Sequence, residues 1–194
     1  MKQGVRWSIA IGLAFVLALV GYWSFFGPLS KEAYLAEVRD REGAFCQRQE
    51  VDDFRVELWY TPAAYMALQQ YEDSLVSRIE AMSGMQYYTL KLGIPGEDLV
   101  KSLTSGPEEV QRLLYYFSYG LQSDIYIEQS GQKLPCVLYH FERSYDLGGS
   151  RTFTLGFEDP AKGQGTSTLV LESALWEQPL RFVIEKDGLP QLWL

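Results

Sequence analysis

The only histidine of the chain lies in the segment CVLYHFERSYD, together with a cysteine and several charged side chains. Cys136, His140 and Glu142 could serve as nucleophile, base and orienting carboxylate. The segment is predicted to be a strand, in which residues two apart share a face and each residue rises about 3.3 Å. Cys136 and His140 would then be about 13 Å apart, whereas a nucleophile and its base need a hydrogen bond of about 3 Å. We therefore do not expect a Cys–His dyad.

A catalytic alternative uses the other pair of groups on this face. His140 and Glu142 would lie about 6.6 Å apart, so Glu142 could orient the imidazole while a serine from elsewhere acts as nucleophile. No G-x-S-x-G motif identifies that serine, and a carboxylate pair for glycoside hydrolysis cannot be selected by spacing among 25 acidic residues. No glycine-rich phosphate-binding loop is present. A hydrolase remains the alternative hypothesis, and no cofactor is expected.

The two cysteines have a second interpretation. In an exported domain, Cys46 and Cys136 are expected to form a disulfide, which would close a loop of about 90 residues and stabilise the fold by about 4–5 kcal/mol. Two buried free thiols are the alternative. No metal is expected, because two cysteines and one histidine cannot supply the four ligands of a structural zinc site. Asp159 lies near Gly and Pro and is expected to be a solvated turn residue.

Aromatic side chains give the best candidate for a binding site. Tyr115, Tyr116 and Tyr119 lie on a predicted helix, beside an apolar stripe formed by Val110, Leu113, Leu114, Phe117 and Leu121. Tyrosines outside such a stripe could line a groove for a partner or a glycan, because their rings are rigid and half polar. The alternative is a helix that is buried on most of its sides.

The N-terminal segment predicts a membrane anchor. No charged residue occurs from Trp7 to Ser30, and the first 20 of these residues would form a helix about 30 Å long, enough to cross a bilayer. Lys2 and Arg6 precede the segment, so the N-terminus is expected in the cytoplasm and the rest is expected to be exported. A cleaved signal peptide is the alternative, although no A-x-A-like cleavage site follows the apolar run.

The predicted domain organisation follows from this anchor. It comprises a cytoplasmic N-terminus at 1–6, a transmembrane signal-anchor at 7–27, a juxtamembrane helix or spacer at 28–44 and an exported domain at 45–194. In that domain a strand, a helix over Ala64–Met82, a strand and a helix over Pro107–Leu121 precede about five strands. Consecutive strands favour antiparallel pairing, so we expect an α+β domain with a mainly antiparallel sheet and two main helices on one face.

Charge and composition restrict the function. The formal net charge is -8, and no cluster of Lys and Arg offers the basic patch that nucleic-acid binding needs. Nucleic acid is therefore not an expected partner. The expected partners are the membrane, through the N-terminal segment, and an envelope protein. The leading hypothesis is binding or assembly in the envelope of a bacterium, most simply at the inner membrane facing the periplasm. A domain that only spaces or stabilises a neighbouring membrane protein is a further alternative.

Three segments resemble a pattern in uncharacterised membrane-anchored envelope proteins of Bacteroidota. These are VELWYTPAAYMALQ, LYHFERSYDL and FVIEKDGLPQL, and the resemblance would cover most of residues 46–194. It implies a cell-envelope setting. It implies no activity and no catalytic residue.

Overall fold

The computed structural model of the chain describes residues 27–70, 75–142 and 149–194. Its strands form two antiparallel sheets. The first has the order β1 (Cys46–Val51), β2 (Phe54–Thr61), β3 (Met85–Gly93), β7 (Arg151–Glu158), β6 (Leu138–Glu142). The second has the order β5 (Gln132–Pro135), β4 (Ile125–Gln129), β8 (Thr166–Leu171), β9 (Leu180–Glu185).

Alternation of side chains explains why the two sheets pack face to face. Strand β9 buries every second residue, beginning with Leu180, and exposes the others. Strand β3 follows the same rule over its full length. The buried faces meet in one apolar core, which includes Phe182 of β9 and Leu90 of β3. This is the arrangement of a β-sandwich, in which each sheet hides one face against the other.

The two sheets are joined differently along their two sides. On one side a continuous segment changes sheets: β5 pairs with β4, the chain bends at Cys136 and Val137, and β6 pairs with β7. On the other side Gln47 and Gln49 of β1 donate their side-chain amides to the backbone oxygens of Val183 (2.5 Å) and Arg181 (2.7 Å) of β9. We call the first the corner and the second the seam. Together they hold the two sheets in a flattened, barrel-like sandwich, although β6 pairs by its backbone only with β7 among the described strands and remains an edge strand.

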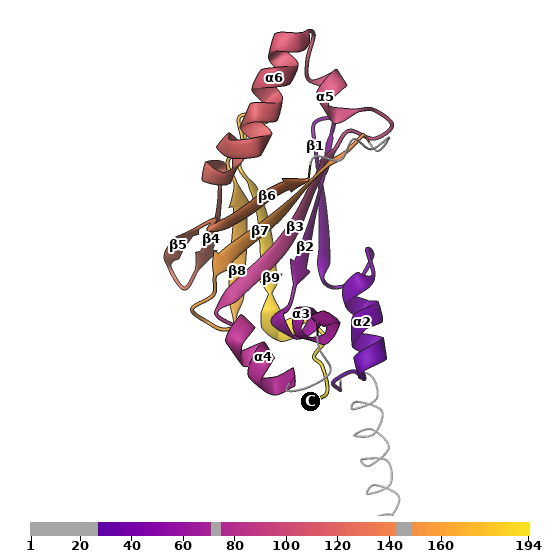
Figure 1. The fold of residues 1–194 in the computed structure, drawn as a ribbon, viewed down its shortest axis with the longest axis vertical. Coiled ribbons are helices and arrows are strands. Elements are labelled where there is room, and N and C mark those ends of the chain that lie inside the picture. Colours follow the sequence, from indigo (N-terminus) through magenta and orange to yellow (C-terminus); the bar gives the residue numbers. More distant parts are fainter. Residues whose placement is uncertain (1–26, 71–74, 143–148) are drawn as a thin grey trace, which may run out of the picture.

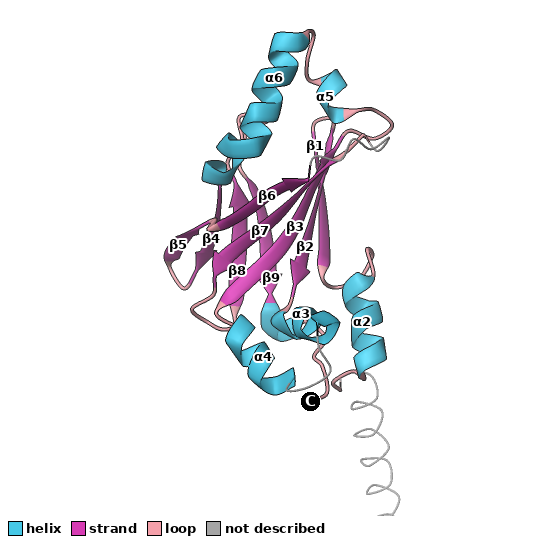
Figure 2. Ribbon diagram, viewed as in Figure 1, coloured by secondary structure: helices cyan, strands magenta, loops and turns pink. Residues whose placement is uncertain are grey.

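Helices cover the two ends of this barrel (Figure 1 and Figure 2). At one end lie α5 (Leu99–Ser102) and α6 (Pro107–Tyr115), followed by a π-helical turn η1 (Tyr116–Gly120) and a 3₁₀ turn η2 (Leu121–Asp124). At the other end lie α2 (Lys31–Arg39), α3 (Ala63–Gln70) and α4 (Leu75–Met82), with the C-terminal segment that follows η3 (Lys186–Gly188).

The expected fold class is therefore wrong in its arrangement, although the domain is α+β with antiparallel pairing. The strands after residue 124 do not extend a single sheet, because some pair with one another and others join the first sheet. Each sheet buries its inner face against the other, so the helices pack at the ends of the barrel and not on one sheet face. The predicted long helix over Ala64–Met82 is represented by α3 and α4, which pack against each other, and residues 71–74 between them lie outside the described residues.

The transmembrane part of the expected fold class is not supported either. Residues 7–26 of the predicted anchor lie outside the described residues. Among the helices of the described segments, none is both long and apolar enough to cross a membrane. The architecture that the structure supports is the α+β domain alone.

Helix α2, expected as a spacer, belongs to the domain. Ser30 caps it by accepting a hydrogen bond from the backbone N–H of Ala33 (3.4 Å). Tyr34 and Val38 are buried in the common core. Leu29 joins the C-terminal segment through backbone hydrogen bonds of 2.7 and 2.8 Å. The domain boundary expected at residue 45 therefore moves towards the N-terminus, to about Leu29.

Candidate binding surface

Strand β6 presents His140 and Glu142 to solvent, while Tyr139 and Phe141 point towards the core. This alternation agrees with the strand predicted from the sequence. Cys136 departs from it: the prediction placed it on the exposed face with His140, but its side chain is buried. The chain bends between sheets at the corner, so the alternation is interrupted before β6 begins.

Among the described residues, the His140 face does not assemble a catalytic triad. His140 and Ser118 line the same shallow depression of about 320 Å³, and within the part of the chain that the structure describes Ser118 is the candidate nucleophile that lines this depression. However, the Ser118 hydroxyl donates to the backbone oxygen of Leu114 (2.7 Å). Among the described residues no hydrogen bond or ion pair joins His140 to Glu142. Within the described residues, His140 is therefore not joined to an orienting carboxylate.

The three candidate tyrosines divide into two groups. Tyr115 and Tyr119 are 68% and 62% exposed, and their rings lie 5.1 Å apart. Tyr116 is half-buried, and its hydroxyl donates to Asp124 (2.7 Å) and lies 2.8 Å from the Ser173 hydroxyl. Burial raises the pKa of the Tyr116 hydroxyl. Tyr115 and Tyr119 are thus available to a partner, whereas Tyr116 holds the turn to the domain.

Helical spacing explains this division. Tyr115 and Tyr119 are four residues apart and share one face of the helix, whereas Tyr116 points to another face. Leu114, at the end of α6 and expected in the buried stripe, is exposed, while Phe117 of the π-helical turn η1 is fully buried. Gly120 is needed for the close packing of the turn, because a Cβ atom there would lie 2.7 Å from the ring of Tyr116.

Phe117 anchors the turn on the sheet. Its ring lies 5.8 Å from the ring of Phe141 and 5.6 Å from that of Phe153. The hydroxyl of Tyr139 donates to the backbone oxygen of Phe117. Below the turn, Gln122 donates to the backbone oxygen of Cys136 (2.9 Å), which ties η2 to the corner. The exposed tyrosines are therefore held rigidly beside β6.

Exposed apolar side chains gather around Tyr119. One depression of about 450 Å³ joins Tyr119 to Pro135 and Cys136, and the shallower one joins it to His140. Val137 and Leu138, which lie between Cys136 and His140 in the sequence, are also exposed. We call this patch the Tyr119 surface and define it by Leu114, Tyr115, Tyr119, Val137, Leu138 and His140. It lies along β6, which is an edge strand of its sheet.

The expected disulfide between Cys46 and Cys136 is absent, and both thiols are free. Cys46 lies on β1 and Cys136 beside β6, the opposite edges of the five-stranded sheet. Across the sheet these edges are about 19 Å apart, whereas the Cα atoms of a disulfide lie within about 7 Å. Burial raises the pKa of the Cys136 thiol to about 11 and also raises the pKa of the half-buried Cys46 thiol. Neither thiol has the lowered pKa of a catalytic nucleophile.

We expect iodoacetamide to label Cys46 first in the native protein. Cys136 should react only after unfolding, because it is buried and holds little thiolate near pH 8. The mass of the intact protein, measured before and after urea without reductant, counts the labels. Cys46→Ala should carry no label in the native state. Absence of any labelling after unfolding would show that the thiols are oxidised and would contradict the structure.

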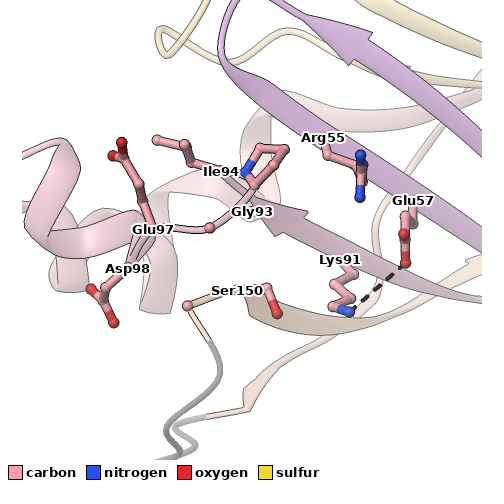
Figure 3. A pocket seen from close by; sticks show the side chains of 11 residues that line it. Arg55, Glu57, Lys91, Gly93, Ile94, Glu97, Asp98 and Ser150 are labelled. Carbon is pink, nitrogen blue, oxygen red and sulfur yellow. Dashed lines mark ion pairs between the residues drawn. The ribbon is translucent and has the colours of Figure 1, made fainter.

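A charged depression of about 490 Å³ lies at the ends of β2 and β3 (Figure 3). Glu57 accepts a hydrogen bond from Arg48 (3.0 Å) and lies 3.9 Å from the Lys91 ammonium. Arg55, also in this depression, pairs with Glu50 at 3.0 Å. The charges are compensated within the protein, so the depression offers no strongly charged site. In the described segments no cluster of three His, Cys, Asp or Glu side chains is arranged to hold a metal ion.

A buried ion pair is the largest feature that sequence reasoning missed. Asp159, expected in solvent, and Lys186 each have side chains that are only 1% exposed, and they meet at 2.7 Å. Asp159 also accepts hydrogen bonds from the backbone of Gly163 (2.8 Å) and from the side chain of Gln129 (3.1 Å). Burial lowers the pKa of Lys186, and the hydrogen bond and charge of Asp159 act in the opposite direction.

This pair continues into a buried network between the sheets. Gln86 of β3 donates to Gln129 of β4 (3.2 Å). It accepts from the hydroxyls of Tyr88 (2.8 Å) and Ser167 (3.3 Å). Buried polar groups specify a unique packing only when all of them are satisfied. Within the described part of the chain no fully buried side-chain nitrogen or oxygen lacks a partner, so the network fixes the relative position of the sheets.

Comparison with known proteins gives no family for this chain. No family model matches it, and neither a curated protein nor a solved structure shows significant similarity. The resemblance to envelope proteins of Bacteroidota therefore remains a prediction from the sequence.

Proposed function

We propose that this chain is a binding protein of the bacterial cell envelope, and that the Tyr119 surface binds an extended segment of a partner protein. The observation that carries the proposal is the exposed pair of Tyr115 and Tyr119, whose rings contact each other at a tilt of 52°, beside an edge strand. An edge strand can pair its backbone with an added strand, while neighbouring pockets receive alternate side chains. Rigid tyrosines add contact area at small cost in conformational entropy.

Two further observations limit the partner and the place. The net charge of -8 favours a partner segment that carries basic side chains. The uncharged segment from Trp7 to Ser30, preceded by Lys2 and Arg6, supports a location at the membrane with the domain exported. The hydrolytic alternative has weaker support, because His140 lacks an orienting carboxylate among the described residues.

Site-directed photo-crosslinking tests the proposal with the full chain in membranes of its native cells. A photoreactive amino acid at position 138 should give a discrete adduct with a partner polypeptide, because Leu138 is exposed on β6. The Tyr119→Ala substitution should reduce that adduct about tenfold or more, as expected for loss of a central aromatic contact.

The matched control places the same photoreactive amino acid at position 183. Val183 is also an exposed apolar residue, but it lies on β9, in the other sheet. No comparable adduct is expected there. Equal adducts at both positions, no adduct at position 138, or an adduct that is insensitive to Tyr119→Ala would overturn the proposal. Peptide mapping should place the adduct in an extended segment of the partner.

A further inference from the structure

A small cavity lies between the buried ion pair and the helices at the α2 end of the barrel. Its volume is about 170 Å³. Asp159 and Lys186 line one part of it, and Tyr34 and Tyr60 line another. Apolar side chains on the remaining wall include Phe45, Pro62, Ile79, Met85, Leu189 and Leu192, and Ser83, Lys162 and Gln191 add polar groups to it. The cavity therefore combines a few converging polar groups with an apolar wall, as ligand pockets do.

Two tyrosine hydroxyls in this cavity have no hydrogen-bond partner among the described residues. Tyr34 is 2% exposed and Tyr60 is 7% exposed, yet neither hydroxyl makes a hydrogen bond within the described residues. Among the described residues, every fully buried side-chain oxygen has a hydrogen-bond partner. The two hydroxyl oxygens, which have none, are therefore at least slightly accessible. They therefore open onto the cavity. Burial raises the pKa of both hydroxyls, so both remain protonated donors at neutral pH.

Lys186 adds further donors to the same space. An ammonium group carries three N–H donors, and among the described residues Lys186 donates to a single acceptor, the carboxylate of Asp159. Its nitrogen also lies 5.7 Å from the centre of the Tyr60 ring. Asp159, in contrast, already accepts three hydrogen bonds. Beside the ion pair, whose two charges compensate each other, the cavity thus offers unused donors and Asp159 has little unused acceptor capacity.

We propose that this cavity binds a short neutral acyl compound, an amide or an ester, whose carbonyl oxygen accepts hydrogen bonds from Tyr34, Tyr60 and Lys186. The carbon chain would lie against the apolar wall. A carboxylate would meet the charge of Asp159 and an amine that of Lys186, in a place where little water screens either. At about 30 Å³ for each water-sized group, the cavity holds about five or six non-hydrogen atoms. This site is independent of the Tyr119 surface.

Three probes of one size test the proposal on the full chain. Butyramide, butyrate and butylamine share a four-carbon chain and differ in charge, and saturation-transfer NMR can measure the dissociation constant of each. Butyramide should bind most tightly, in the millimolar range expected of so small a ligand. No detectable binding of butyramide, or tighter binding of either charged probe, would overturn the proposal.

Single-atom substitutions then locate the site. Tyr34→Phe and Tyr60→Phe remove only a hydroxyl, and each should weaken butyramide about two- to tenfold. Tyr115→Phe removes a hydroxyl from the opposite end of the barrel and should leave the dissociation constant unchanged. Ala64→Leu adds bulk at the cavity wall and should abolish binding even if the tyrosine variants are less stable. Binding that survives both Tyr60→Phe and Ala64→Leu would place butyramide elsewhere and overturn the assignment.

Discussion

Asp159→Ala should lower the free energy of unfolding by about 3–5 kcal/mol, because it leaves the Lys186 ammonium buried without a counter-charge. The pair is 2.7 Å long and both side chains are 1% exposed. The substitution also removes the acceptor for Gln129 and for the backbone of Gly163. Urea unfolding of the purified full chain measures this loss. The dependence of the unfolding free energy on urea concentration should stay unchanged, so that the shift in midpoint reports stability alone.

Two comparisons separate the buried charge from a general effect of the substitution. Adding Lys186→Met to Asp159→Ala removes the stranded ammonium and should restore part of the lost stability, so the two changes should not be additive. Glu50→Ala breaks the exposed pair with Arg55 and should cost no more than about 1 kcal/mol. A loss of that small size for Asp159→Ala would mean that the buried pair does not form.

Phe117→Ala should destabilise the domain by about 3–5 kcal/mol, the usual cost of emptying a core position of this size. Phe117 is fully buried and packs against Phe141 and Phe153. Because it anchors η1, its loss should also weaken partner binding at the Tyr119 surface. Unfolding midpoints and the crosslinking yield from position 138 measure the two effects.

The control for Phe117 is Tyr115, a nearby aromatic residue that is exposed. Tyr115→Ala should change stability by no more than about 0.5 kcal/mol, since surface substitutions rarely do more, but it should reduce crosslinking. Phe117→Leu keeps most of the apolar volume and should fall between the two in stability. If Phe117→Ala left both stability and crosslinking intact, η1 would not be the element that positions the surface.

Local features of this fold could be predicted from the sequence because they depend on neighbouring residues. The predicted start of a helix at Pro107 is confirmed by α6. The exposed and buried faces of β6 are confirmed as well, since alternation along a strand is a local property. The sharing of strands between two sheets was not predictable in this way, because pairing is decided by the packing of inner faces far apart in the sequence.

The candidate sites were predictable only in part, for the same reason. Alternation along β3 puts Gln86 in register with the buried Tyr88 and Leu90, and along β9 it leads from Ile184 to Lys186. A polar side chain on a core-facing position indicates a buried partner, and this signal could have led to the network. The identity of that partner, Asp159, could not be read from spacing. The division of the tyrosines could have been predicted from helical spacing, because Tyr115 and Tyr119 are four residues apart and share a face that Tyr116 does not.

The seam between β1 and β9 also constrains the order in which the domain can fold. The hydrogen bond from Gln47 to Val183 joins residues 136 positions apart. During synthesis β1 and β2 can pair at once as a local hairpin, whereas the seam must wait until β9 has left the ribosome. Until then the outer edge of β1 is open to pairing with other chains. Gln47 and Gln49 keep the outer edge of β1 polar during this time. The side chains that later form the seam therefore also reduce the risk of aggregation before β9 is in place.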